Sequence, residues 1–175
     1  MDNIILIGMP GAGKSTVGVL LAKTLGYAFL DTDLLIQERE GDLLQRLVDR
    51  LGVDGFLERE ADVLCGLECR RTVIAPGGSA VCRERAMENL RRLGPVVYLH
   101  LPLEELTRRL NNISTRGIAL APGQTLEELY VCRAPLYRSY ADLTVEVGGQ
   151  SLEKTVEQVV TTLRLYEKER IKHEV

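Results

Sequence analysis

The sequence predicts an α/β fold, in which a five-stranded parallel sheet is covered by helices on both faces. Five short apolar runs alternate with longer amphipathic runs along the 175 residues, and the connections between them are mostly short. The first apolar run leads directly into Gly8-Met9-Pro10-Gly11-Ala12-Gly13-Lys14-Ser15, a glycine loop of the kind that joins a strand to a helix. We therefore expect a single three-layer domain over residues 1–175.

The elements follow from hydrophobic periodicity and turn residues. We expect strands, in chain order, at 4–7, 28–30, 73–75, 96–99 and 143–147. We expect helices near 14–25, 34–50, 55–70, 83–92, 103–110, 125–138 and 151–170. The remaining segment, 111–124, is long, rich in turn residues and without a period, which is typical of a mobile lid over a binding site.

Composition limits the possible partners. A net charge of −3 predicts no broad basic surface for nucleic acid or an anionic membrane. No apolar run reaches the ~18 residues of a membrane-spanning helix, and the first three residues lack the basic start of a signal peptide. Four cysteines without a Cys-x2-Cys pair and only two histidines make a zinc site unexpected. We expect a cytoplasmic monomer without nucleic-acid or membrane partners.

The glycine loop has the spacing of a phosphate cradle, Gly-x4-Gly-Lys-Ser. Its glycines let backbone amides turn inward, and the N-terminus of the following helix adds partial positive charge. Lys14 is expected to reach the β- and γ-phosphates of ATP, and Ser15 is expected to ligate Mg²⁺. The residues expected to bind the nucleotide in this loop are Gly11, Ala12, Gly13, Lys14, Ser15 and Thr16.

Two carboxylates follow the second predicted strand, in Asp31-Thr32-Asp33. Functional residues gather at the carboxyl ends of parallel strands. One carboxylate, Asp31, could hold Mg²⁺ or its water shell, and Asp33 could orient a substrate hydroxyl near the γ-phosphate. The alternative is that either residue merely caps the next helix. The third strand carries no aspartate that could serve as the usual second Mg²⁺ ligand. Asp31 is therefore the carboxylate expected to serve the Mg²⁺.

Further candidates lie near the ends of the later strands. Gly77-Gly78-Ser79 could allow close approach of a ligand to the backbone, or could form a plain tight turn. Arg116, in the predicted lid, could bring a cation onto a transferring phosphoryl group. Arg133 lies on the predicted helix after the lid, and Arg109, just before the lid, could stack on adenine. Solvated surface charge is the alternative for Arg116 and Arg133.

Taken in order, the phosphate loop, Asp31-x-Asp33, Gly77-Gly78, Arg116 and Arg133-Ala-Pro-Leu-Tyr137 resemble the shikimate kinase family over about residues 3–165. The resemblance implies the P-loop kinase sheet with strand order 2-3-1-4-5 and substrate-binding helices over about 33–62. It also implies transfer of the ATP γ-phosphate to the 3-hydroxyl of shikimate.

The resemblance also implies individual roles. Asp33 would contact the reacting hydroxyl, while Lys14 and Arg116 would stabilise the phosphoryl group. Arg133 would bind the substrate carboxylate, the turn at Gly77, Gly78 and Ser79 would face the substrate ring, and Arg109 would pack on adenine.

This chain departs from the family pattern at the acceptor side. The family has Phe-Arg-x-x-Glu on its substrate-binding helix, whereas residues 56–60 read Phe-Leu-Glu-Arg-Glu, so that Leu57 replaces the arginine that pairs with the substrate carboxylate. Arg59 points to another side of a helix. Ser79 replaces the third glycine of the family turn, and 116–118 reads Arg-Gly-Ile in place of Arg-Pro-Leu. The chain could therefore phosphorylate a different small alcohol or hydroxy acid, or could bind nucleotide without catalysis.

Overall fold

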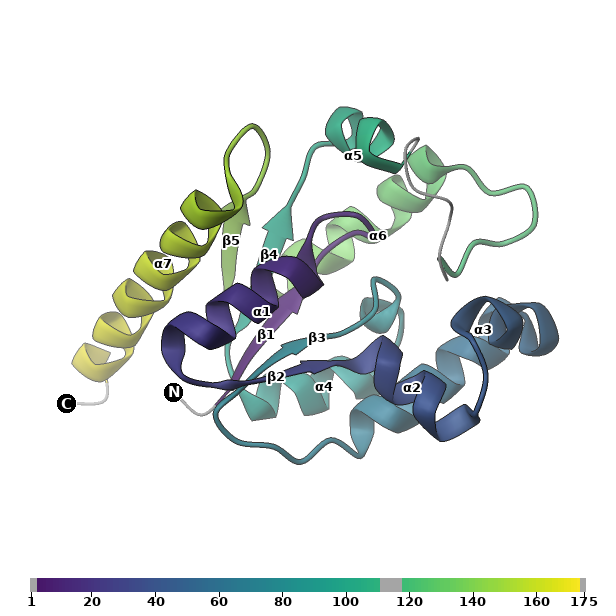
Figure 1. The fold of residues 1–175 in the computed structure, drawn as a ribbon, viewed down its shortest axis with the longest axis horizontal. Helices are drawn as coiled ribbons and strands as arrows, with labels where there is room; N and C mark the ends of the chain where they lie inside the picture. Colours follow the sequence, from purple (N-terminus) through teal and green to yellow (C-terminus); the bar gives the residue numbers. More distant parts are fainter. Residues whose placement is uncertain (1–2, 111–117, 174–175) are drawn as a thin grey trace.

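A single parallel sheet forms the centre of the molecule in the computed structural model, which describes residues 3–110 and 118–173 (Figure 1). Its strands are β1 (Asn3–Ile7), β2 (Ala28–Asp31), β3 (Thr72–Ala75), β4 (Val96–His100) and β5 (Leu143–Glu146). They lie in the order β2-β3-β1-β4-β5, and each neighbouring pair is parallel. The expected sheet and its order are confirmed.

Helices cover both faces of the sheet and complete the three layers. They are α1 (Lys14–Leu25), α2 (Thr32–Glu40), α3 (Leu44–Cys65), α4 (Glu84–Leu93), α5 (Leu103–Leu110), α6 (Leu126–Tyr140) and α7 (Leu152–His173), with a short 3-10 turn η1 (Ala80–Cys82). The α1 and α7 helices lie together on one face, and α4 and α6 lie on the other (Figure 1). Among the described residues, no helix is long and apolar enough to cross a membrane.

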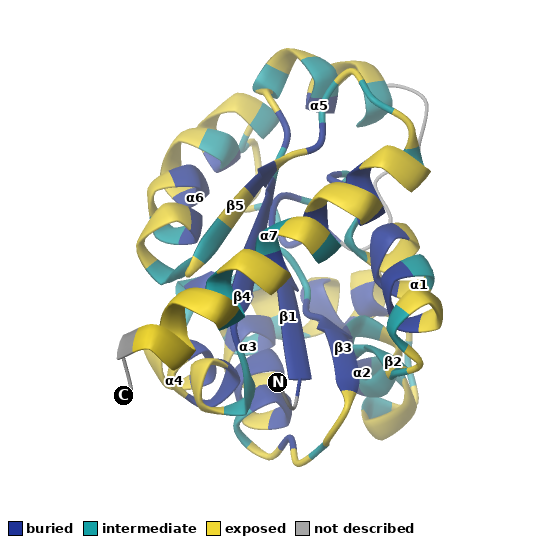
Figure 2. Cartoon of the chain, turned by 90° about the vertical axis from the view of Figure 1, so that its left-hand side faces the viewer, coloured by how far each residue is buried: buried dark blue, intermediate teal, exposed yellow. Residues whose placement is uncertain are grey.

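The three central strands form the core because helices cover both of their faces. Every residue of β1 and β3 is buried, as are four of the five in β4 (Figure 2). Such continuous apolar runs are typical of parallel strands buried on two sides. The edge strands β2 and β5 are less buried. The sheet is thus a rigid base whose strand ends hold the following loops in place.

The predicted helices at 34–50 and 55–70 were wrong in their boundaries. The α2 helix ends at Gly41, which adopts a left-handed conformation with φ 66°, as glycine does after many helices. The α3 helix then runs from Leu44 to Cys65 with a kink at Gly52, where φ 71° and ψ 171° are not helical. Residues 66–70, expected to be helical, lie outside it. The second half of α3, after the kink, brings Glu60 close to Gly77, which follows β3.

Candidate active site

A cavity of about 640 Å³ opens at the carboxyl ends of β1, β2 and β3, where ligands bind in open α/β sheets. Its size is within the usual range for a small-molecule site. The predicted site residues that line it are Gly11, Gly13, Lys14, Ser15, Thr16, Asp31, Asp33, Gly77, Gly78, Ser79, Arg109 and Arg133. Residues far apart in the sequence therefore meet around one space.

The phosphate loop leaves the start of α1 open to an anion. Gly11 and Gly13 have φ of 84° and 96°, which glycine adopts without strain. The N-cap of α1, Gly13, brings no side-chain hydrogen bond, and the first turn holds no acidic residue. Its free amides and helix dipole favour a phosphate. Ala12, also predicted to bind nucleotide, is buried and donates its amide to Met9 O at 3.1 Å.

Lys14 is a buried cation that folds back onto its own loop. Its Nζ donates to Gly8 O at 2.8 Å and to Met9 O at 3.1 Å. Burial lowers the pKa of Lys14 to about 8, and the nearby guanidinium of Arg133 acts in the same direction, while Asp33 opposes them. Lys14 stays protonated at neutral pH but is poorly solvated, so an anion in the cavity would stabilise it.

Asp31 caps α2, one of the two roles expected for it, and it also contacts the side chain of Ser15, the other residue expected to hold Mg²⁺. Its Oδ1 accepts from the Asp33 amide at 3.0 Å as the N-cap of α2, and its Oδ2 accepts from Ser15 Oγ at 2.7 Å. Asp33 is not a cap. Within 3–110 and 118–173, no group of three acidic, histidine or cysteine residues could hold a metal. A single hydroxyl and carboxylate nevertheless suit Mg²⁺, which keeps several waters and uses substrate phosphates as ligands.

Two carboxyl groups, the half-buried Asp33 and the buried Glu60, lie close to Gly77. A Cβ on Gly77 would lie 2.8 Å from Asp33 Oδ1 and would also collide with Glu60 Oε1, so a larger residue there would require both carboxyl groups to move. Burial, and secondarily Asp31, raises the pKa of Asp33 to about 6. Burial also raises the pKa of Glu60 to about 7, and Asp33 adds to that effect. Both groups therefore titrate near neutral pH, where a proton acceptor is useful.

The glycine turn is tied to the phosphate loop by close contacts. A Cβ on Gly78 would lie 2.8 Å from Cδ of Pro10, and Gly78 O accepts a 2.6 Å hydrogen bond from the Tyr137 hydroxyl. The turn is therefore more than a plain reversal of the chain. It brings the acceptor side of the cavity against the nucleotide side.

The predicted arginines have different outcomes. Arg133 is 4% exposed and donates to Ala119 O at 3.1 Å, so the alternative of a surface charge is wrong for this residue. Among the described residues it has no ion pair with a carboxylate. Arg109 lines the cavity with Nη1 3.4 Å from Gly11 O. Arg116 lies outside the described residues, and its role stays a prediction.

Neither Leu57, which stands where the family has an arginine, nor Arg59 is among the described residues that line the cavity. Leu57 is 8% exposed. Arg59 points outward and lies 3.9 Å from Glu40, as expected from its helical position. Sequence reasoning missed Phe56, which lines the cavity, and Glu60, which lies behind the glycine turn. The only available signal for Glu60 was its place in the Phe-x-x-x-Glu spacing.

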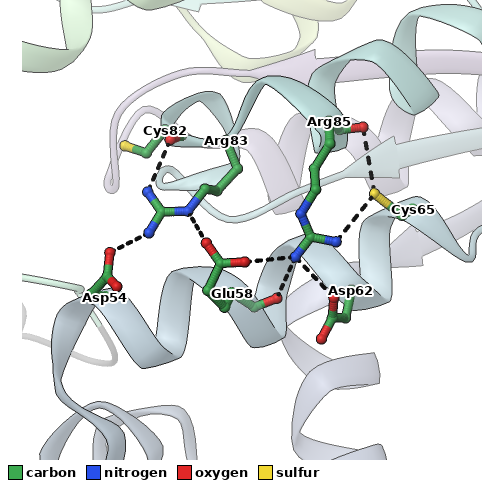
Figure 3. A network of polar contacts seen from close by, with 7 residues as sticks. All are labelled: Asp54, Glu58, Asp62, Cys65, Cys82, Arg83 and Arg85. Carbon is green, nitrogen blue, oxygen red and sulfur yellow. Dashed lines mark hydrogen bonds and ion pairs between the residues drawn. The ribbon is translucent and has the colours of Figure 1, made fainter.

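A network of ion pairs joins α3 to the start of α4 outside the cavity (Figure 3). Arg83 contacts Asp54 and Glu58, while Arg85 contacts Glu58 and Asp62, both at 2.8 Å. Asp54, Glu58 and Asp62 share one face of α3 because they are spaced four apart. Exposed pairs of this kind contribute about 0.2–1 kcal/mol each, so we expect only a modest effect on stability.

Glu60 predicts a particular pH dependence of stability. Because its pKa rises from 4.5 to about 7 on folding, its stabilising contribution is complete below pH 4.5 and is lost as pH rises through 7. The loss amounts to roughly 3 kcal/mol, and Asp33 adds a loss of the same sign. Glu60→Gln should therefore reduce the fall in Tm between pH 5 and pH 7.5, as measured by thermal unfolding.

Glu58→Gln is the matched control, two residues away on the exposed face of α3. Hydrogen bonds from Arg83 and Arg85 lower the pKa of Glu58, so its contribution has the opposite sign and is lost as pH falls. The control should keep the fall in Tm between pH 5 and pH 7.5. An unchanged fall in Glu60→Gln would show that Glu60 is not the buried titrating group.

The phosphate loop, the carboxyl group beside it and the parallel 2-3-1-4-5 sheet define a P-loop kinase with a small acceptor. Residues 10–164 match the family described as Shikimate kinase. A shikimate kinase of Pseudomonas aeruginosa (strain LESB58) is 41% identical over 167 residues, covering 94% of this chain and 97% of the relative. The chain belongs to the shikimate kinase family, and it is a phosphotransferase with an alcohol as acceptor.

Solved structures agree with this assignment. A shikimate kinase from Acinetobacter baumannii, in complex with shikimate, superposes with a TM-score of 0.85 at 34% identity, covering 96% of this chain and 95% of that one. A gluconokinase from Sinorhizobium meliloti 1021 gives a TM-score of 0.62 at 22% identity, covering 97% of this chain and 96% of that one. The second likeness shows the fold alone.

Proposed function

We propose that this kinase transfers the γ-phosphate of ATP to the 3-hydroxyl of shikimate. One observation carries the choice of acceptor: the buried Arg133 guanidinium, without an ion pair among the described residues, lines the same cavity as Asp33. A buried cation without a counter-ion is costly unless a ligand supplies one. An acceptor with both a carboxylate and a hydroxyl group fits Arg133 and Asp33 together.

The residues of the cavity support an in-line transfer. Asp33 would accept the proton of the acceptor hydroxyl as the hydroxyl oxygen forms a bond to Pγ. The bond from Pγ to the oxygen that bridges it to the β-phosphate would break, and ADP would leave. Lys14 would stabilise the negative charge on the transferring group. Arg116 is proposed, from the family pattern, to add a second cation there. Arg109 would pack on the adenine.

Ser15 and Asp31 are the residues that would hold Mg²⁺ with its waters. Bound Mg²⁺ would neutralise charge on the β- and γ-phosphates. The hydroxyl of Ser15 and the carboxylate of Asp31 already lie in contact, so the oxygen ligands are gathered before the nucleotide binds. The monomeric state and the cytoplasmic location remain expectations from the sequence.

Coupled ADP release at saturating ATP and Mg²⁺ tests the acceptor. Shikimate should show saturable turnover at millimolar concentration or below, and gluconate and amino alcohols should show little. A second candidate, phosphorylation of another small alcohol, is favoured by the absence of a cation at Leu57 and by the side chain of Ser79 at the cavity wall. Turnover of another alcohol with none of shikimate would establish that second candidate.

A further inference from the structure

Glu60 has an unusual environment for a carboxyl group. It is 1% exposed, its Oε2 accepts a 2.6 Å hydrogen bond from Ser79 Oγ, and its Oε1 is buried without a hydrogen-bond partner among the described residues. Ser79 is itself 5% exposed. A buried hydrogen bond to a group that can ionise is stronger than one between neutral groups. Within the part of the chain that the structure describes, the Ser79 hydroxyl is the hydrogen-bond donor that ties this carboxyl group to the glycine turn.

Position 57 lies on the same helix as Glu60. Residues 57 and 60 are three apart on α3, so their side chains are neighbours on the helix surface. An arginine at position 57, as in the family pattern, would lie within reach of the Glu60 carboxyl group. Leu57 offers no charge and no hydrogen bond. The two departures of this chain, at Leu57 and Ser79, thus affect the same carboxyl group from two sides.

We propose that Ser79 is a positioning residue whose hydroxyl fixes the Glu60 carboxyl group behind the acceptor pocket, in place of an arginine at position 57. The proposal rests on the proposed function, because it concerns how the acceptor is held. Ser79 and Leu57 then form a coupled pair of substitutions, and neither is by itself a defect of the site.

The position of Glu60 affects the acceptor through the glycine turn. Glu60 Oε1 and Asp33 Oδ1 both lie against the α-carbon side of Gly77, so a rotated Glu60 would displace the turn or the Asp33 carboxylate. The charged groups that act on Glu60 are Asp33, Arg133 and Lys14, all from the cavity. The hydrogen bond from Ser79 favours the ionised form of Glu60. Its loss should raise the pKa of Glu60 further.

A double-mutant cycle with shikimate as the varied substrate tests the proposal. Ser79→Ala should raise the KM for shikimate about 10-fold, the effect of one charge-assisted hydrogen bond, with little change in the KM for ATP. In a Leu57→Arg background the same change should raise that KM less than about twofold, because the new arginine holds Glu60. Ser79→Thr, which keeps the hydroxyl, should retain most of the wild-type KM.

Arg85→Ala is the control because it breaks a different tie to the same half of α3, the one that joins it to α4 (Figure 3). It should leave the KM for shikimate near the wild-type value. An equal rise in KM for Arg85→Ala would mean that any loosening of α3 has this effect, and would overturn the proposal. An equal effect of Ser79→Ala in both backgrounds at position 57 would also overturn it.

The pH dependence of Tm gives a readout that needs no turnover. In the wild-type background, Ser79→Ala should raise the pH at which Tm falls. In the Glu60→Gln background, Ser79→Ala should leave the pH dependence of Tm unchanged. If shikimate is not phosphorylated but this shift occurs, the proposed acceptor is wrong and the Ser79–Glu60 tie stands. If shikimate is phosphorylated and no shift occurs, the proposed function stands and the positioning role is wrong.

Discussion

Asp33→Asn is expected to lower kcat about 1,000-fold while leaving the affinity for ATP within about twofold of wild type, in line with the 10²- to 10⁴-fold contribution of a positioned proton acceptor. Asparagine keeps the size of the side chain but cannot take the hydroxyl proton. Burial and Asp31 raise the pKa of Asp33 to about 6, so kcat of the wild type should also fall as pH drops below 6. Coupled ADP release and calorimetric titration of ATP measure the two effects.

Asp49→Asn is the control for that substitution, since it makes the same chemical change on the exposed side of α3, where Asp49 Oδ1 accepts a 2.9 Å hydrogen bond from Gln45 Nε2. The kcat of Asp49→Asn should match that of the wild type. If Asp33→Asn kept the wild-type kcat, Asp33 would have no part in the reaction.

Arg133→Met is expected to raise the KM for shikimate at least about 100-fold, because a charge-assisted bidentate contact with a carboxylate is lost. Stability should move in the other direction. The free enzyme buries this guanidinium to 4% exposure, so an apolar side chain of similar length removes a buried charge, and Tm should stay the same or rise. Acceptor kinetics and thermal unfolding of the same preparation test both effects.

Arg138→Met provides the matched control on the exposed face of the same helix. It should change neither the KM for shikimate nor Tm by much. A large fall in Tm for Arg133→Met would show that Arg133 holds α6 in place, and an unchanged KM would show that another group receives the acceptor carboxylate.

The phosphate loop and the sheet could be predicted because their signals are local. Gly8–Ser15 has a fixed spacing, and the buried strands are continuous apolar runs. The helix boundaries near Gly41 and Gly52 could not be predicted in the same way, because Gly41 ends α2 whereas Gly52 only kinks α3. Tertiary packing decides between these outcomes, and composition around the two glycines does not differ enough to show it.

The candidate site was predictable in its residues but less so in their contacts. The sequence allowed Asp31 to be either a cap or a metal ligand; the structure shows the cap and a hydrogen bond from Ser15, and the metal role stays a prediction. The closeness of Pro10 to Gly78 depends on two loops that are remote in sequence. Glu60 was missed because a glutamate in a charged helix looks solvated until the fold buries it beside Ser79.

The acceptor is tested most directly by comparing shikimate with its neutral methyl ester in the ADP-release assay, with ³¹P NMR of the product. The cavity predicts saturable phosphorylation of shikimate and a kcat/KM for the ester at least about 100-fold lower, because only the free carboxylate pairs with Arg133. No phosphorylation of millimolar shikimate, or equal use of the ester, would contradict a cavity built around a carboxylate-bearing alcohol.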